Sequence, residues 1–193
     1  MADNNIEIEI QVKIEKPEIL IKFLEENASF KEEIHQLDKY FSPTHRNFGA
    51  VRPVEEWLRV RKSGNKASFD YKHLRFDKNG KNYSCDQYET NIGDSDQMEK
   101  ILAVLNFAPL ITVNKKRKIW MYKDYEIAVD NIEGLGDFVE IEYLGKKENL
   151  DPKEVTGEMV AFLKKIGYQK IYRSYLGYPF QLLFPQEIKY EEE

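Results

Sequence analysis

The stretch that decides the fold is residues 6–14, which read Ile6-Glu7-Ile8-Glu9-Ile10-Gln11-Val12-Lys13-Ile14. Apolar and polar side chains alternate here without interruption. Because successive side chains of a strand point to opposite faces of a sheet, the stretch predicts a strand with one apolar and one charged face. The same one-sided alternation returns in several segments further along the chain.

The remaining segments repeat one order of elements. Strand-like runs lie near residues 34–41, 55–63, 67–75, 81–90, 111–121, 124–131 and 137–144. Helical spacing of apolar residues predicts helices over 17–27, 94–106 and 151–166. Asp94 and Gln97 have capping-box spacing, and Asp151 and Gly167 bound the last helix. The order is strand, helix and three strands, used twice and followed by a helix, which indicates a duplicated βαβββ unit.

Composition limits the class of protein. The chain has 193 residues, 41% hydrophobic and 13% aromatic, which is typical of a folded domain. One third of the residues are charged, yet the net charge is −5, which argues against a nucleic-acid or membrane surface. Cys85 is the single cysteine, and no apolar run reaches membrane-spanning length. We expect one cytoplasmic domain over residues 1–185 with an acidic, flexible tail over 186–193.

The charged faces carry the functional information. In four of the predicted strands, two charged residues share one face. The pairs are Glu7 with Glu9, Arg59 with Arg61, Asp70 with Lys72, and Glu140 with Glu142. For one strand, a solvated face with cross-strand ion pairs is the ordinary explanation. Eight such strands with three helices instead favour an α+β fold in which a closed β-barrel places the helices outside and the charges inside. Such a lumen has to be wet or occupied, because unpaired buried charge is costly.

A polyanion with a hard divalent cation suits this lumen. Arginine and lysine neutralise phosphate oxygens, while carboxylates hold Mg²⁺ or Mn²⁺. Phosphoryl transfer depends on positioning and charge stabilisation, so it needs no Ser/His/Asp set, and the sequence shows none. Gly134-Leu135-Gly136 is a hairpin turn rather than a phosphate-binding loop.

These residues resemble the motifs of the CYTH superfamily, the triphosphate tunnel enzymes, over about residues 6–178. The similar segments are Glu7-Ile8-Glu9-Ile10-Gln11, Asp38-Lys39-Tyr40-Phe41, Leu58-Arg59-Val60-Arg61, Tyr71-Lys72, Lys115-Lys116-Arg117, Asp130 with Gly134 to Glu142, and Arg173-Ser174-Tyr175. The amino-acid residues of these motifs are most similar to those of the class IV adenylyl cyclase (CyaB-type) branch. The order and spacing of the motifs, rather than any one of them, make the resemblance specific.

The resemblance implies an eight-stranded antiparallel tunnel, a homodimer and a set of site residues. The metal ligands it implies are Glu7, Glu9, Asp130, Glu140 and Glu142. The phosphate ligands are Lys13, Arg59, Arg61, Lys72, Lys115 and Arg117, with Arg173 at the tunnel mouth. Glu7, Glu9, Arg59, Lys72 and Glu140 are the expected catalytic residues.

Three functions remain open on the sequence. The resemblance favours a class IV adenylyl cyclase that converts ATP to 3′,5′-cyclic AMP and pyrophosphate. A triphosphatase acting on inorganic, thiamine or nucleoside triphosphate needs the same charges. A non-catalytic polyphosphate- or nucleotide-binding module is the third reading, because Gln11 stands where the family motif has lysine.

Overall fold

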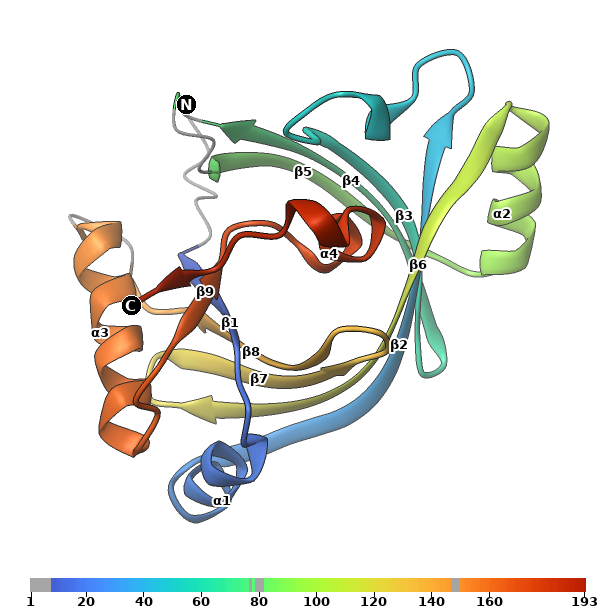
Figure 1. The fold of residues 1–193 in the computed structure, drawn as a ribbon. Coiled ribbons are helices and arrows are strands. Elements are labelled where there is room, and N and C mark those ends of the chain that lie inside the picture. The colour runs from blue at the N-terminus through green and yellow to red at the C-terminus, as the bar shows by residue number, and fades with distance from the viewer. Residues whose placement is uncertain (1–7, 77, 79–81, 147–149) are drawn as a thin grey trace. The chain divides into compact units, whose positions relative to one another are not determined.

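The computed structural model describes residues 8–76, 78, 82–146 and 150–193 (Figure 1). In chain order the elements are β1 (Glu9–Lys13), α1 (Pro17–Asn27), β2 (Ser29–Pro43), η1 (Phe48–Ala50), β3 (Glu56–Ser63), β4 (Lys66–Phe76), β5 (Asn82–Ile92), α2 (Ser95–Val104), β6 (Phe107–Tyr122), β7 (Tyr125–Ile132), β8 (Gly136–Tyr143), α3 (Pro152–Ile166), β9 (Tyr172–Ser174), α4 (Tyr178–Leu183), η2 (Pro185–Glu187) and β10 (Glu191–Glu192). The order from β1 to α3 is the predicted βαβββ unit used twice.

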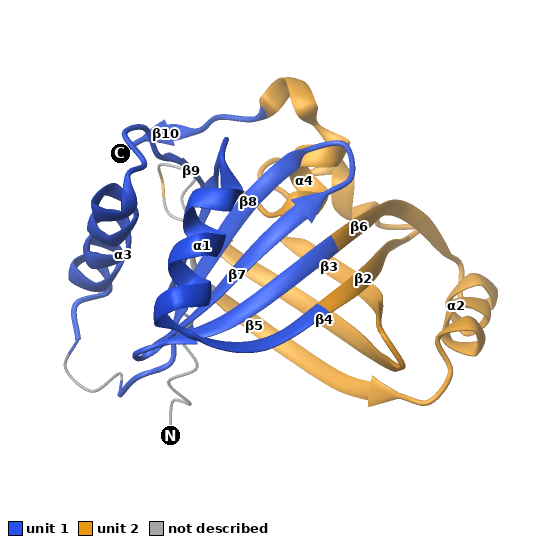
Figure 2. Ribbon diagram, turned by 90° about the horizontal axis from the view of Figure 1, so that it is seen from below, with its two compact units in different colours: residues 1–33, 116–175, 188–193 blue, residues 34–115, 176–187 orange. Residues whose placement is uncertain are grey.

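The chain divides into two compact units, shown in Figure 2. Unit 1 comprises residues 1–33, 116–175 and 188–193, and unit 2 comprises 34–115 and 176–187. The long strands β2 and β6 contribute residues to both units. The units therefore do not coincide with the two repeats read from the sequence, because unit 1 combines β1 and α1 of the first repeat with β7 and β8 of the second.

The sheet is mostly antiparallel, as predicted, but hydrogen bonds do not close it. Strands neighbour one another in the order β10-β9-β1-β8-β7-β6-β2-β3-β4-β5. Among the described residues, no ladder joins the terminal strands β10 and β5. The α+β class is thus confirmed, whereas the closed eight-stranded barrel is not. The extra strands β9 and β10 were not predicted, since two or three residues carry too little periodicity to be recognised.

Helices α1 and α3 cover the apolar face of β1, β7 and β8 in unit 1. Leu20, Leu24 and Leu163 from the helices are fully buried with Val12 and Val139 from the strands. The predicted helix boundaries hold because their caps form: the Asp151 side chain accepts a hydrogen bond from Lys153 N, at 2.9 Å. The alternation of residues 8–14 thus leads directly to this packing, and it leaves the polar residues on the other face.

Helix α2 covers apolar residues of the strands in unit 2. Its Leu102 packs with Phe41, Leu58 and Val60, and Asp94 Oδ1 accepts a hydrogen bond from Gln97 N at 2.9 Å, as the capping spacing predicted. Ile101 and Val104 remain exposed on the same helix.

The acidic segment 186–193, expected to be flexible, contains β10, which pairs with β9. Within the described part of the chain, no helix is both long and apolar enough to cross a membrane. The assignment of residues 1–185 to a single domain stays a prediction.

We predict that Leu163→Ala lowers the free energy of unfolding by about 2–5 kcal/mol, because Leu163 is fully buried between α3 and the sheet. Urea unfolding followed by circular dichroism measures this change. Leu144→Ala is the matched control: Leu144 is 47% exposed, so the expected change is below about 0.5 kcal/mol. Equal losses in the two variants would contradict the assignment of the core.

Candidate functional site

Three carboxylates form one row across β1, β8 and β7 of unit 1. Glu9 is the Cα partner of Glu142, which is also the partner of Glu126. Directly opposed residues of antiparallel strands point to the same side, so the three carboxylates are neighbours. Their mutual repulsion favours a cation nearby. Lys31 provides one at the Glu126 end, with Nζ 2.6 Å from Glu126 Oε2.

Arg117 organises the next part of this face. Its Nε donates to Asp130 Oδ1 at 2.7 Å, and its Nη2 donates to both Asp130 and Glu140. The Asp130 side chain has no exposed surface, and Arg117 is 13% exposed. A carboxylate buried to this extent needs a hydrogen-bonded counter-charge, which Arg117 supplies.

Gln11 and Lys13 complete the polar face of β1. Gln11 Nε2 donates to Glu140 Oε1 at 3.0 Å, so the residue that departs from the family motif contacts a predicted metal ligand directly. The Lys13 ammonium lies 5.8 Å from the Phe138 ring centroid and 5.7 Å from that of Tyr190. Rings at this distance attract a cation through their quadrupoles.

Arg173 is not brought together with these residues. It pairs with Val12 in the β1–β9 ladder, whereas Gln11 pairs with Ser174. Opposed residues share a face, so Arg173 lies on the side of the apolar Val12. Its guanidinium lies 4.6 Å from the Tyr175 ring centroid, and its Nη1 is 3.6 Å from Glu193 Oε1. Its predicted phosphate role gains no support from this position.

The polar face of unit 2 holds a buried cluster of two arginines and two aspartates. Arg61 donates twice to Asp38, with Nε and Nη2 each 2.6 Å from a carboxylate oxygen. Arg59 Nη2 donates to Asp70 Oδ1 at 3.1 Å, and Ser68 Oγ donates to Asp70 Oδ2 at 2.9 Å. Asp38 pairs with Arg61, and Arg59 with Asp70, in neighbouring strands, so the sheet register creates the cluster.

Burial and charge compete at Asp38. Burial alone would raise the pKa of this carboxyl, but the hydrogen bonds from Arg61 and the positive charges of Arg59 and Arg61 outweigh it, so the pKa of Asp38 is lowered. Burial likewise opposes the charge on Arg59, whereas its neighbours Tyr40, Asp38 and Asp70 raise the pKa of the guanidinium. Asp38 and Arg59 therefore both stay ionised at neutral pH.

Arg59 retains one unused donor. Its Nε is buried and has no hydrogen-bond partner in the structure, which is costly for a guanidinium N–H. Lys72 lies on the same sheet face as Arg59, since it pairs with Trp57. Lys115 is 4% exposed, and its Nζ lies 5.3 Å from the Tyr178 ring centroid. Arg59, Arg61, Lys72 and Lys115, all predicted phosphate ligands, thus belong to unit 2, and an anion there would satisfy Arg59 Nε.

The carboxylates of the site are oxygen donors that do not form a compact metal-binding cluster among the described residues. Among the described residues, no three His, Cys, Asp or Glu side chains converge closely enough to hold a metal ion. Glu7 lies outside the described residues. The donors on the face of Glu9 and Glu142 are nevertheless carboxylate oxygens, the type that Mg²⁺ and Mn²⁺ prefer, whereas Asp130 and Glu140 are bound to Arg117. The donor chemistry fits a hard divalent cation.

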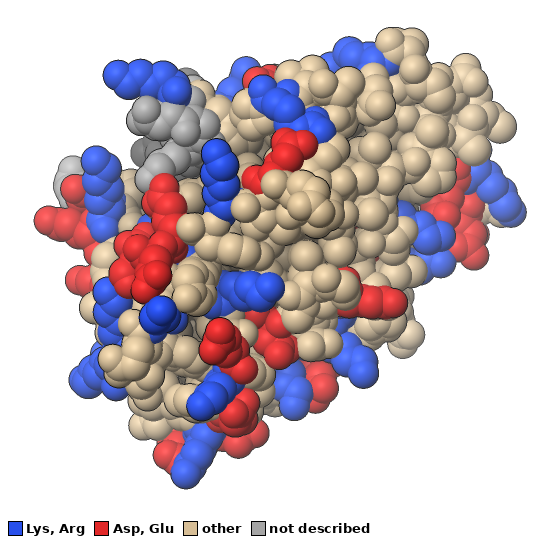
Figure 3. All heavy atoms as spheres, in the orientation of Figure 1, with Lys and Arg blue, Asp and Glu red and all other residues tan. Residues whose placement is uncertain are grey.

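Sequence reasoning missed Asp38, Asp70 and Ser68 as members of the site. Their signal was present: Asp38 falls within the quoted second-strand motif, and Asp70 shares a strand face with Lys72. The sequence did not show which residues lie opposite them, because only the register of β2 and β3 places Asp38 against Arg61. Figure 3 shows acidic and basic side chains interspersed over the face it draws, in agreement with the mixed charge of the sequence.

We predict that Asp38→Asn lowers the free energy of unfolding at neutral pH by about 3 kcal/mol, because it leaves Arg61 buried without its counter-charge. Urea unfolding measures this change. Asp96→Asn is the control, since the Asp96–Lys62 pair is on the surface and its loss should not be measurable.

The pH dependence follows from the lowered pKa of Asp38. Its contribution to stability is complete above its ordinary pKa of 3.8 and is lost as the pH falls through the lower folded value. The difference between wild type and Asp38→Asn should therefore shrink below that pH. A difference that stays constant from about pH 7 to about pH 3 would contradict the ionised pair.

Comparison with known proteins agrees with this geometry. The CYTH domain family matches residues 5–175. A protein of Methanocaldococcus jannaschii named "Putative adenylate cyclase MJ0240" is 32% identical over 175 residues, which cover 89% of this chain and 97% of the relative.

Two solved structures share the fold. The PH1819 protein of Pyrococcus horikoshii OT3 is 27% identical with a TM-score of 0.74, covering 94% of this chain and 99% of its own. The HpAC1 protein of Hippeastrum is 19% identical with a TM-score of 0.68, covering 95% and 97% of the two chains. The chain belongs to the CYTH family and is an enzyme of that superfamily.

Proposed function

We propose that this enzyme acts on the triphosphate chain of ATP with the help of a divalent cation, and forms 3′,5′-cyclic AMP and pyrophosphate. The observation that carries the proposal is the buried cluster in unit 2, in which Asp38 and Asp70 orient Arg59 and Arg61 while Arg59 Nε remains without a partner. Arginine held in this way presents a planar fork of donors that matches phosphate oxygens.

The cluster favours a polyanion over a single charge. Arg59, Arg61, Lys72 and Lys115 supply four positive charges in unit 2, and Asp38 and Asp70 bind the two arginines. A triphosphate supplies several negative oxygens to these donors. Because Asp38 and Asp70 already fix the guanidinium groups, binding costs less side-chain entropy than it would with free arginines.

CYTH proteins form a metal-dependent family, and Glu9 and Glu142 are the residues we propose to hold the ion, together with the predicted ligands Glu7, Asp130 and Glu140. Mg²⁺ or Mn²⁺ would supply Lewis-acid charge neutralisation at the phosphate oxygens. Lys31 and Arg117 pair with Glu126, Asp130 and Glu140 in unit 1, and a divalent cation would lower the repulsion between Glu9 and Glu142, which are directly opposed in the ladder of β1 and β8.

In cyclisation the ribose 3′-oxygen forms a bond to the α-phosphorus, the bond from that phosphorus to the bridging oxygen of pyrophosphate breaks, and the 3′-hydroxyl transfers its proton to solvent water. The arginines and lysines of unit 2 stabilise the negative charge that collects on the leaving pyrophosphate. This role needs charges that are fixed before the substrate arrives, which the Asp38 and Asp70 pairs provide.

A triphosphatase is the second candidate, and a protein of the same fold favours it. The amide of Gln11 binds Glu140 where the family motif has an ammonium, so one positive charge expected near the phosphates is missing. The Hippeastrum protein that shares this fold has a dominant triphosphatase activity. Inorganic, thiamine or nucleoside triphosphate would be the substrate of such an enzyme, while a homodimer and a cytoplasmic location remain predictions for either candidate.

We expect the purified protein with ATP and Mg²⁺ or Mn²⁺ to form cyclic AMP and pyrophosphate in equal amounts, and to form neither when a chelator is added. Ion-exchange chromatography separates the products, with inorganic and thiamine triphosphate as parallel substrates. Phosphate release without cyclic AMP would replace the cyclase by the triphosphatase. Absence of turnover with all three substrates would refute both.

We expect Arg61→Lys to lower kcat/KM by roughly 10- to 100-fold, because lysine keeps the charge but cannot donate two parallel hydrogen bonds. Steady-state kinetics with the best substrate of the preceding series measures the loss. Lys62→Arg is the matched control, since Lys62 lies one residue further on the opposite strand face and pairs with the exposed Asp96. A thermal melt of both variants separates lost function from lost folding, and equal kcat/KM values for Arg61→Lys and wild type would remove Arg61 from the site.

A further inference from the structure

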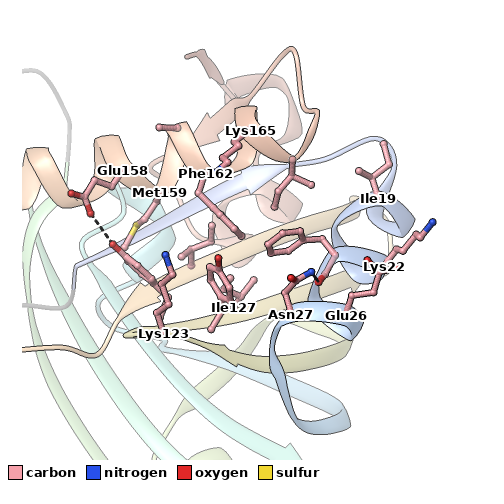
Figure 4. Close-up of a pocket in the computed structure, with 16 residues that line it drawn as sticks. Ile19, Lys22, Glu26, Asn27, Lys123, Ile127, Glu158, Met159, Phe162 and Lys165 are labelled. Atoms are coloured by element: carbon pink, nitrogen blue, oxygen red, sulfur yellow. Dashed lines mark hydrogen bonds between the residues drawn. The ribbon is translucent and has the colours of Figure 1, made fainter.

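A cavity of about 620 Å³ lies in unit 1, between α1, α3 and the apolar side of the sheet (Figure 4). Its volume is in the range of small-molecule sites. Ile127 and Ile141 line it, and these residues alternate along β7 and β8 with Glu126, Glu140 and Glu142. The cavity therefore lies on the opposite sheet face from the carboxylates and is separate from the proposed phosphoryl-transfer chemistry.

The walls of the cavity are aromatic. The Phe23 ring meets those of Tyr122 and Phe162 edge to face, with centroids 5.5 Å apart in both pairs, and Tyr122 and Phe162 stack at 5.3 Å. Met159, which is 1% exposed, adds a polarisable thioether to the lining. Rings that already pack against one another form a rigid wall on which a further ring can stack.

Charged groups stand around the apolar interior. Lys22, Lys123 and Lys165 line the cavity with Glu26 and Glu158, so the lysines outnumber the glutamates by one. None of the three lysines has an ion-pair partner among the described residues. Glu158 instead accepts a hydrogen bond from the Tyr125 hydroxyl at 3.1 Å. The surplus positive charge favours an anionic ligand.

Lys123 is held in an unusual conformation at this cavity. It lies in the turn between β6 and β7 with φ = +54°, a region that costs a lysine about 1–2 kcal/mol relative to glycine. Figure 4 shows its side chain directed toward α3 over the cavity, whereas that of Lys22 is directed away. Its ammonium lies 5.3 Å from the Tyr122 ring centroid. The two-residue turn between β6 and β7 requires this conformation, and it fixes the position of Lys123 beside Tyr122.

We propose that this cavity binds a small aromatic monoanion, with the aromatic body stacked on Phe162 and Tyr122 and the acidic group paired with Lys123. The packed rings of Phe23, Tyr122 and Phe162 favour a flat apolar body, and the lysines that line the cavity favour an anion. An inorganic polyphosphate does not suit this lining, since it has no flat apolar body to stack on Phe162 and Tyr122.

The probe is 8-anilinonaphthalene-1-sulfonate, an aromatic ring system with one anionic group, titrated into the full chain and followed by fluorescence. We expect saturable binding of one probe per chain with a Kd on the order of 10 µM. Excess inorganic triphosphate should leave the Kd unchanged. Displacement by triphosphate would place the probe in the charged site and overturn the proposal.

Three variants test the assigned roles. Lys123→Gly should raise the Kd roughly 10-fold without lowering the Tm, because glycine adopts the positive φ freely. Lys164→Ala removes the same charge from an exposed residue of α3 that does not line the cavity, and should change the Kd less than about twofold. Ala161→Trp, at a cavity-lining residue of α3, should block binding. Unchanged probe affinity in both Lys123→Gly and Ala161→Trp would refute the site.

Discussion

The structure depends on one constraint: charges on a sheet face that is largely buried have to be neutralised within the protein. Arg117 meets it in unit 1 by binding Asp130 and Glu140, and Arg61 and Arg59 meet it in unit 2 by binding Asp38 and Asp70. Such pairs stabilise a fold little compared with apolar residues of equal size, but losing one partner is costly. Their presence on both units therefore points to a functional requirement for charge rather than to stability.

The ion pairs also prepare the arginines for an anionic ligand. A guanidinium already fixed by an aspartate keeps its charge and its direction, so a phosphate can add to the remaining donors without reordering the side chain. Arg59 illustrates this, with Nη2 bound to Asp70 while Nε has no partner. In unit 1 the balance is different, since the carboxylates of Glu9, Glu142 and Glu126 are opposed across β1, β8 and β7, and Glu126 is paired with Lys31. The two units thus carry complementary electrostatic roles.

The two faces of the sheet in unit 1 have separate chemistry because of strand alternation. Glu140 and Glu142 point to the polar side, whereas Ile141 between them reaches the cavity beneath α1 and α3. A single strand can therefore serve a charged site and an apolar one. Lys123, in the turn that joins β6 to β7, adds one charge to the lining of this cavity, and the periodicity of the sequence does not predict this position.

The sequence by itself determined the order of the elements, the helix caps at Asp94 and Asp151, and which residues of each strand are apolar, because these properties depend on neighbours a few positions away. It also identified the charged residues and, through the order of its motifs, the CYTH family. Only the tertiary structure decided that Asp38 meets Arg61, that Gln11 binds Glu140, and that Arg173 lies on the apolar side. It also revealed the open sheet and the cavity. These features depend on strand register and helix packing between residues far apart in the chain, where shifting a register by one residue exchanges the two faces.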